Sequence, residues 1–120
     1  MFFLEAGINH FGKIKEANKI LNFFLKSSFK NLTYMIHNES FYYSQKIKGF
    51  NFSLPNEFYK NAIKKCHSKN KKIGLSVCDE KTFYNYKNLK FDFFKLLSVS
   101  INNKNLINVL NKKKKPIYIS

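Results

Sequence analysis

The sequence lacks arginine and tryptophan altogether and has only seven acidic residues. All 22 of its basic residues are lysine, so the 120-residue chain carries a formal net charge of +15. A charge of this size is typical of proteins that bind nucleic acids or anionic membranes. Nucleic-acid sites usually rely on arginine, because its guanidinium group donates two parallel hydrogen bonds to a phosphate or a guanine. We therefore interpret the lysine excess as compositional bias, and we expect no nucleic-acid partner.

Cysteine is also scarce, and long apolar runs are missing. Cys66 and Cys78 are too few for a disulfide framework and have no metal-site spacing, so we interpret both as reduced thiols of a cytoplasmic protein. No apolar stretch is long enough to span a membrane, and Glu5 interrupts the N-terminal apolar run that a signal peptide would need. We expect one domain over residues 1–120, with no membrane partner.

Short apolar runs alternate with amphipathic segments along the whole chain. Strands are predicted at residues 2–7, 32–37, 72–78, 91–97 and 116–120, and helices at 13–27, 53–69, 80–88 and 103–111. This order predicts an α/β fold of five parallel strands with four intervening helices and right-handed crossovers. A doubly wound open sheet and part of a TIM (β/α)8 barrel share this order, and hydrophobic periodicity does not separate them. The chain has no glycine-rich nucleotide-binding motif.

Polar residues mark the start of two predicted helices. Ser53 precedes Pro55 and an early glutamate, a pattern typical of a helix start with serine as the capping residue. Asp79 is the predicted cap of the next helix. The connection over residues 38–52 is long for a compact domain, which indicates a function or a structure of its own.

Three segments resemble motifs of the sialic acid synthase (N-acetylneuraminate synthase) family. Residues 5–12, EAGINHFG, are similar to the family's opening motif E-x-G-x-N-H-x-G. Residues 94–98, FKLLS, resemble F-K-I-x-S of its fourth strand, and residues 115–120, KPIYIS, resemble K-P-I-x-x-S of its fifth. The resemblance runs through the whole chain in order. It implies a partial (β/α)8 barrel that is truncated after the fifth strand.

The resemblance also implies a reaction. The family joins phosphoenolpyruvate to an N-acylated amino sugar, with Mn or Mg as divalent metal, and makes a nine-carbon sugar acid such as sialic, legionaminic or pseudaminic acid. The family's metal-binding histidines lie on later strands, so no metal ligand is expected in residues 1–120. A half-barrel leaves two strand edges unpaired. A homodimer or a complementing C-terminal half is therefore expected to complete it.

Glu5 and Lys95 are the central site residues that the resemblance implies. Glu5 would lie at the end of the first strand, where barrels place their chemistry, and would contact the sugar aldehyde and take part in proton transfer. Lys95 would bind the carboxylate or phosphate of phosphoenolpyruvate, because an ammonium group inside an apolar strand needs an anionic partner. The structural alternatives are a Glu5–lysine pair, and a salt bridge from Lys95 to Asp92 or Glu5.

Four further residues are expected at the substrate site. Ser98 and Ser120 end two of the three motifs and would donate hydrogen bonds to the substrate. Asn9 and His10 would shape a loop over the site. The alternative for His10 is a structural histidine that is hydrogen-bonded to the backbone.

Two departures from the family pattern favour a second hypothesis. Residues 35–37, MIH, stand where the family has K-F-Q, whose lysine binds phosphate, and Ser100 replaces an acidic residue. The second hypothesis is a non-catalytic remnant that binds an anionic sugar, a phosphate or a partner subunit. A basic nucleic-acid binder is the third, and only net charge supports it.

Overall fold

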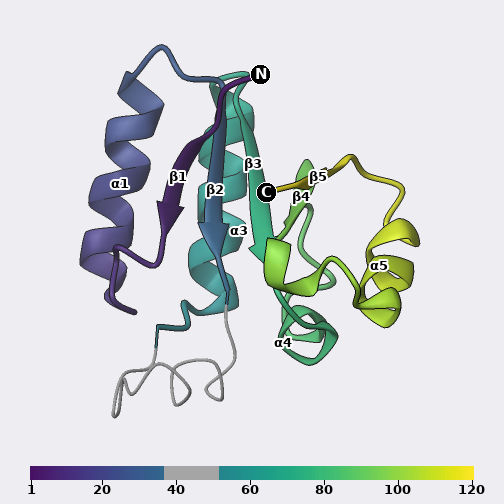
Figure 1. The fold of residues 1–120 in the computed structure, drawn as a ribbon. Helices are drawn as coiled ribbons and strands as arrows, with labels where there is room; N and C mark the ends of the chain where they lie inside the picture. Colours follow the sequence, from purple (N-terminus) through teal and green to yellow (C-terminus); the bar gives the residue numbers. More distant parts are fainter. Residues whose placement is uncertain (37–51) are drawn as a thin grey trace.

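Strands and helices alternate along residues 1–36 and 52–120, the part of the chain that the computed structural model describes (Figure 1). The strands are β1 (Leu4–Gly7), β2 (Asn31–Met35), β3 (Lys72–Val77), β4 (Phe93–Leu96) and β5 (Ile117–Ile119). The α-helices are α1 (Ile14–Lys26), α3 (Asn56–Ser68), α4 (Glu80–Tyr84) and α5 (Lys104–Asn111), and the short 3-10 helix η1 (Ser98–Ser100) follows β4. Every predicted strand and helix is confirmed, and each is shorter than predicted. The predicted connection over residues 38–52 lies, except for Phe52, outside the described residues.

The strand order distinguishes the two architectures that the sequence left open. The five strands form one sheet in the order β1-β2-β3-β4-β5, and every neighbouring pair is parallel. A doubly wound sheet reverses its strand order at a switch point, whereas a barrel adds each strand beside the previous one. Successive right-handed crossovers in one direction place all helices on the same face. The fold is therefore the α/β fold of a partial (β/α)8 barrel.

Aromatic side chains on the convex face join the strands to the helices. The Tyr34 hydroxyl in β2 donates to the carbonyl oxygen of Ala17 in α1 at 2.9 Å. The Tyr34 ring meets Phe58 and Tyr59 of α3 edge to face, with ring centroids 5.4 and 6.0 Å apart. Tyr34 is fully buried, so β2 is fixed against two helices by one side chain.

A second aromatic cluster lies on the concave face, against which none of the helices of residues 1–36 and 52–120 packs. Phe3 precedes β1 and Tyr118 lies in β5, at opposite edges of the sheet, yet their ring centroids are 5.0 Å apart. Phe93 in β4 contacts both rings. A Cβ atom at Gly74 would lie 2.3 Å from the Phe93 ring, so only glycine leaves room for that ring against β3. The sheet is thus curved strongly enough for its two edges to meet through side chains.

The helix ends show which local predictions hold. Asp79 caps α4 as predicted, since its Oδ1 accepts a hydrogen bond from the Thr82 amide at 2.8 Å. The prediction that Ser53 caps α3 is wrong: Pro55 is the N-cap residue, in extended conformation, and α3 begins at Asn56 without a side-chain cap. Proline fixes φ near the value needed there, so the chain enters the helix without a capping hydroxyl.

Lys71 caps the C-terminus of α1, a contact that the sequence did not predict. Its buried ammonium group donates to the carbonyl oxygens of Phe24, Ser27 and Phe29 at 2.8, 2.6 and 2.7 Å. These carbonyls lie at and just beyond the C-terminus of α1, where a cation is favoured by the helix dipole.

No helix among the described residues is long and apolar enough to cross a membrane.

Candidate functional site

The motif EAGINHFG forms a tight turn that leaves β1 and enters α1. Gly7 and Gly12 have φ values of +54° and +71°, a region that favours glycine because it has no Cβ. Within the turn, the Asn9 side-chain amide donates to the Ala6 carbonyl oxygen at 3.0 Å, and His10 Nδ1 accepts from the Gly12 amide at 3.0 Å. These bonds give each polar residue of the turn a structural task.

His10 lies on the convex side of the sheet, apart from the concave face. Its ring is fully buried, 5.9 Å from the Tyr34 ring, and burial lowers its pKa to about 4. Asn9 is exposed beside the same turn. The structural alternative for His10, a bond to the backbone, is present; the substrate roles of Asn9 and His10 remain predictions.

Glu5 and Lys95 meet on the concave face. The Lys95 ammonium group donates to Glu5 Oε1, which makes the ion pair that the sequence offered as the alternative to substrate binding. Asp92, the other partner considered for Lys95, instead pairs with His67 at 3.0 Å and accepts from the Ile73 amide at 2.9 Å. The two site residues with opposite charge therefore share one end and one face of the sheet.

The pair is asymmetric in its access to water. The Lys95 side chain is 7% exposed and the Glu5 side chain is 50% exposed. Lys95 also lies 5.7 Å from the centroid of the Phe3 ring. Burial lowers the pKa of the Lys95 ammonium group. A buried cation whose carboxylate partner is half in water can exchange that partner for a ligand anion at little cost to the carboxylate.

Thr33 and Ser76 complete a polar row between Glu5 and Lys95. Glu5 is paired in register with Thr33, and Ser76 with Lys95. The Thr33 and Ser76 hydroxyl groups are 3.2 Å apart and buried. Four neighbouring strands thus each contribute one polar side chain to the concave face. Thr33 pairs in register with Gly74 and Ser76 with Met35, so Ser76 and Lys95 lie two residues further along the sheet register than Glu5 and Thr33. Neither hydroxyl is among the site residues predicted from the sequence, although each is a polar residue at an alternating position of an apolar strand.

Three serines lie at the C-terminal ends of β4 and β5. Ser98 and Ser120 are both exposed, and the Ser120 amide donates to the Leu96 carbonyl oxygen at 3.1 Å. Both serines therefore lie beyond the C-terminal ends of their strands, on the same end of the sheet. Their substrate roles remain predictions. Ser100 is buried, and its hydroxyl donates to the Cys78 carbonyl oxygen, which ties the turn after β4 to the end of β3.

The divalent metal of the family has no ligand set among residues 1–36 and 52–120. No three side chains of His, Cys, Asp or Glu come together there. Glu5 is paired with Lys95, and the positive charge of the ammonium group repels a metal cation. These residues therefore do not fit a metal site.

Comparison with known proteins agrees with the geometry. A search of curated protein sequences gives no significant match. A protein-family model, described as the NeuB family, matches residues 5–120, which is nearly the whole chain and extends from within β1 through β5. The chain therefore belongs to the NeuB family, the sialic acid synthase family.

Proposed function

We propose that the chain is the phosphoenolpyruvate-binding part of a sialic acid synthase-like enzyme of nine-carbon sugar acid biosynthesis. In that reaction the methylene carbon of phosphoenolpyruvate forms a bond to the aldehyde carbon of an N-acylated amino sugar, water adds to the neighbouring carbon, and inorganic phosphate leaves. The observation that carries the proposal is a buried ammonium group at the C-terminal end of a barrel strand, next to buried hydroxyls. Barrel enzymes bind substrates at this end.

Lys95 would bind the acidic donor. Its ammonium group is desolvated and lies beside the Phe3 ring. A carboxylate or phosphate therefore gains more binding free energy from it than from a solvated lysine. Ser98 and Ser120 would add hydroxyl donors from the rim above. The pair with Glu5 would hold Lys95 in place before the donor arrives.

Glu5 would face the sugar acceptor. When phosphoenolpyruvate replaces Glu5 as the partner of Lys95, the Glu5 carboxylate is released beside the bound phosphoenolpyruvate. It can then accept hydrogen bonds from the sugar, or a proton, during the reaction. Its exposed position suits this exchange, because a released carboxylate remains solvated.

The rest of the barrel would come from a complementing half. Among the described residues β1 pairs only with β2 and β5 only with β4, so two edges of the sheet have no neighbour. Strand edges of this kind pair with other chains. Cys66 and Cys78 are both reduced thiols, which suits a cytoplasmic location.

Titration calorimetry with phosphoenolpyruvate tests the proposal. Lys95→Met is expected to weaken binding at least ten-fold, because it removes the only buried cation on the concave face of the described residues. Lys81→Met is the matched control: it removes the same charge from an exposed position in α4 and should leave affinity unchanged. Equal affinity of Lys95→Met and the unmodified chain would overturn the proposal.

A non-catalytic remnant is the second candidate, and Met35 favours it. Met35 lies at the end of β2 in register with Ser76, at the level of the site, and brings no charge where the family resemblance leads one to expect a phosphate-binding lysine. Such a protein would bind the anion without turnover. Mass spectrometry of the products formed by the completed barrel from phosphoenolpyruvate and N-acetylmannosamine distinguishes the enzyme from the non-catalytic remnant. Formation of a sugar acid that Glu5→Gln abolishes would exclude the non-catalytic remnant.

A further inference from the structure

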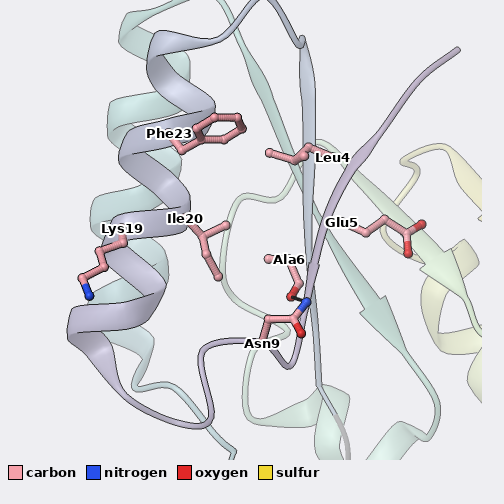
Figure 2. A pocket seen from close by; sticks show the side chains of 7 residues that line it. All are labelled: Leu4, Glu5, Ala6, Asn9, Lys19, Ile20 and Phe23. Carbon is pink, nitrogen blue, oxygen red and sulfur yellow. Dashed lines mark hydrogen bonds between the residues drawn. The ribbon is translucent and has the colours of Figure 1, made fainter.

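A basic hollow of about 480 Å³ lies between the connection from α4 to β4 and the connection from α5 to β5. Both connections enter the sheet there, so the hollow lies at the N-terminal ends of these strands, opposite the end that carries Ser98 and Ser120. Neither Glu5 nor Lys95 lines it. Figure 2 shows the Glu5 carboxylate on the side of β1 that faces away from α1. The basic hollow is therefore separate from the candidate substrate site.

The basic hollow takes its charge from Lys87, Lys90, Lys113 and Lys115. Two of these lysines come from each connection, so they converge from separate parts of the chain. They make up four of the ten lining residues, a larger share than in the whole chain, where 22 of 120 residues are lysine. None of the four forms an ion pair with a carboxylate of residues 1–36 and 52–120. Four ammonium groups around one hollow repel each other, and an anion bound between them removes this repulsion.

Asp92 is the acidic residue of the lining, and it is held by other partners. Its carboxylate is 3.0 Å from Nε2 of His67 in α3 and accepts a hydrogen bond from the Ile73 amide of β3 at 2.9 Å. These bonds hold the carboxylate against α3 and β3. The lysines of the basic hollow are thus left without a counter-ion from the described residues.

Two of the four ammonium groups are held by contacts that leave donors free. The half-buried Lys113 donates to the Lys87 carbonyl oxygen and lies 5.9 Å from the centroid of the Phe83 ring. The Lys87 ammonium group lies 4.8 Å from the centroid of the Tyr84 ring. An ammonium group has three N–H donors, and a contact with an aromatic face does not remove its charge. Both groups can therefore still donate to a ligand in the hollow.

We propose that the basic hollow binds a small molecule that carries a diphosphate group. A phosphate group carries roughly −1.5 to −2 charges near pH 7, so two phosphates are needed to balance four lysines. Lysine binds phosphate as a point charge and does not need the planar geometry of arginine. The volume of the hollow lies within the range of small-molecule sites, roughly 300–1,000 Å³. This site goes beyond the proposed function, because it takes another ligand at the other end of the strands.

Titration calorimetry with pyrophosphate tests the proposal. The background is Lys95→Met, so that the candidate substrate site does not contribute, and the ionic strength is about 0.15 M, which screens long-range attraction by net charge. Lys90→Met combined with Lys115→Met should weaken binding at least ten-fold, and both side chains are exposed, so the fold should tolerate the change. The matched control combines Lys81→Met with Lys112→Met. It removes the same charge from exposed positions outside the hollow and should leave the affinity unchanged.

Three outcomes would overturn the inference. They are no binding of pyrophosphate in the Lys95→Met background, an equal loss of affinity in the double variant and its control, and binding of inorganic phosphate as tight as that of pyrophosphate. An equal loss would mean that net charge alone attracts the anion. Phosphoenolpyruvate affinity is measured for Lys90→Met combined with Lys115→Met in the chain that retains Lys95. It should be unchanged, so a failure here is distinguishable from a failure of the proposed function.

Discussion

Glu5 in β1 and Lys95 in β4 form an ion pair although their strands are not neighbours in the sheet. Two strands lie between them, and these carry the hydroxyl pair of Thr33 and Ser76. The contact requires a curved sheet, because side chains of a flat sheet would not reach across two intervening strands. The curvature therefore makes one site from residues that are 90 positions apart in the sequence.

Lys95→Met should change the free energy of unfolding by less than about 1 kcal/mol, although it removes a buried charge. Loss of the pair leaves the half-exposed Glu5 carboxylate in water, and methionine fills the space beside Phe3. Urea denaturation measures the effect. A loss of more than about 2 kcal/mol would mean that the pair stabilises the fold and is not kept for a ligand.

Lys71→Met should be the costly lysine substitution. It leaves the carbonyl groups of Ser27 and Phe29 without this donor, which we expect to cost about 2–3 kcal/mol, while the Phe24 carbonyl oxygen still accepts from Ser27. Lys72→Met is the control, since Lys72 is exposed and adjacent in the chain. Both variants are compared by urea denaturation, and equal midpoints would contradict the assigned role of Lys71.

Stability should fall on acidification because of His10. Its pKa is about 4 in the folded protein against an ordinary value of 6.5, since burial disfavours the charged ring. Between these two values the unfolded chain binds a proton that the folded chain does not. The free energy of unfolding should therefore decrease as pH falls through this window, by about 2–3 kcal/mol from pH 7 to pH 4.5.

His10→Gln should flatten this pH dependence, because glutamine can still accept a hydrogen bond but does not titrate. His67→Gln is the control, because the His67 ring is 45% exposed and not buried in the fold. Denaturation series at several pH values check both variants. If His10→Gln and the unmodified chain lose stability in parallel on acidification, another group is responsible.

Gly74→Ala should destabilise the fold by about 1–3 kcal/mol, because the new methyl group meets the Phe93 ring. Phe93→Leu in the same chain should reduce this cost, since the smaller side chain leaves room. A double-mutant cycle by thermal unfolding measures the coupling. A cost that is the same in both backgrounds would show that the ring does not fill the space over β3.

Local pattern was enough for the order of the elements and for some of their ends. The helical spacing predicts that one face of α1 is buried, formed by Ile14, Ala17, Ile20, Leu21, Phe24 and Leu25. Ala17, Leu21 and Phe24 are buried in the structure, Ile20 and Leu25 are partly buried, and Ile14 in the first turn is exposed. Asp79 was recognised as a cap because a cap acts over three residues. Ser53 was misread for the same reason: a serine before proline matches the capping pattern, but the helix begins after Pro55.

The lysines show where local pattern stops. Lys71 and Lys95 are buried, while most of the other lysines that the structure describes are exposed, and residue type alone did not distinguish Lys71 from its neighbours. Lys95 could be singled out because it interrupts an apolar strand. Lys71 lies next to another lysine, and its three acceptors belong to a segment more than 40 residues away.

The sequence by itself determined the βα alternation, the loop after β1 and membership of the NeuB family, because all three depend on residue types at fixed local spacing. Only the tertiary structure decided that the strands follow one another in a curved sheet, that Lys95 pairs with Glu5 and not with Asp92, and that two hydroxyls lie between them. Such contacts depend on the register and curvature of strands far apart in the chain, which no local spacing specifies.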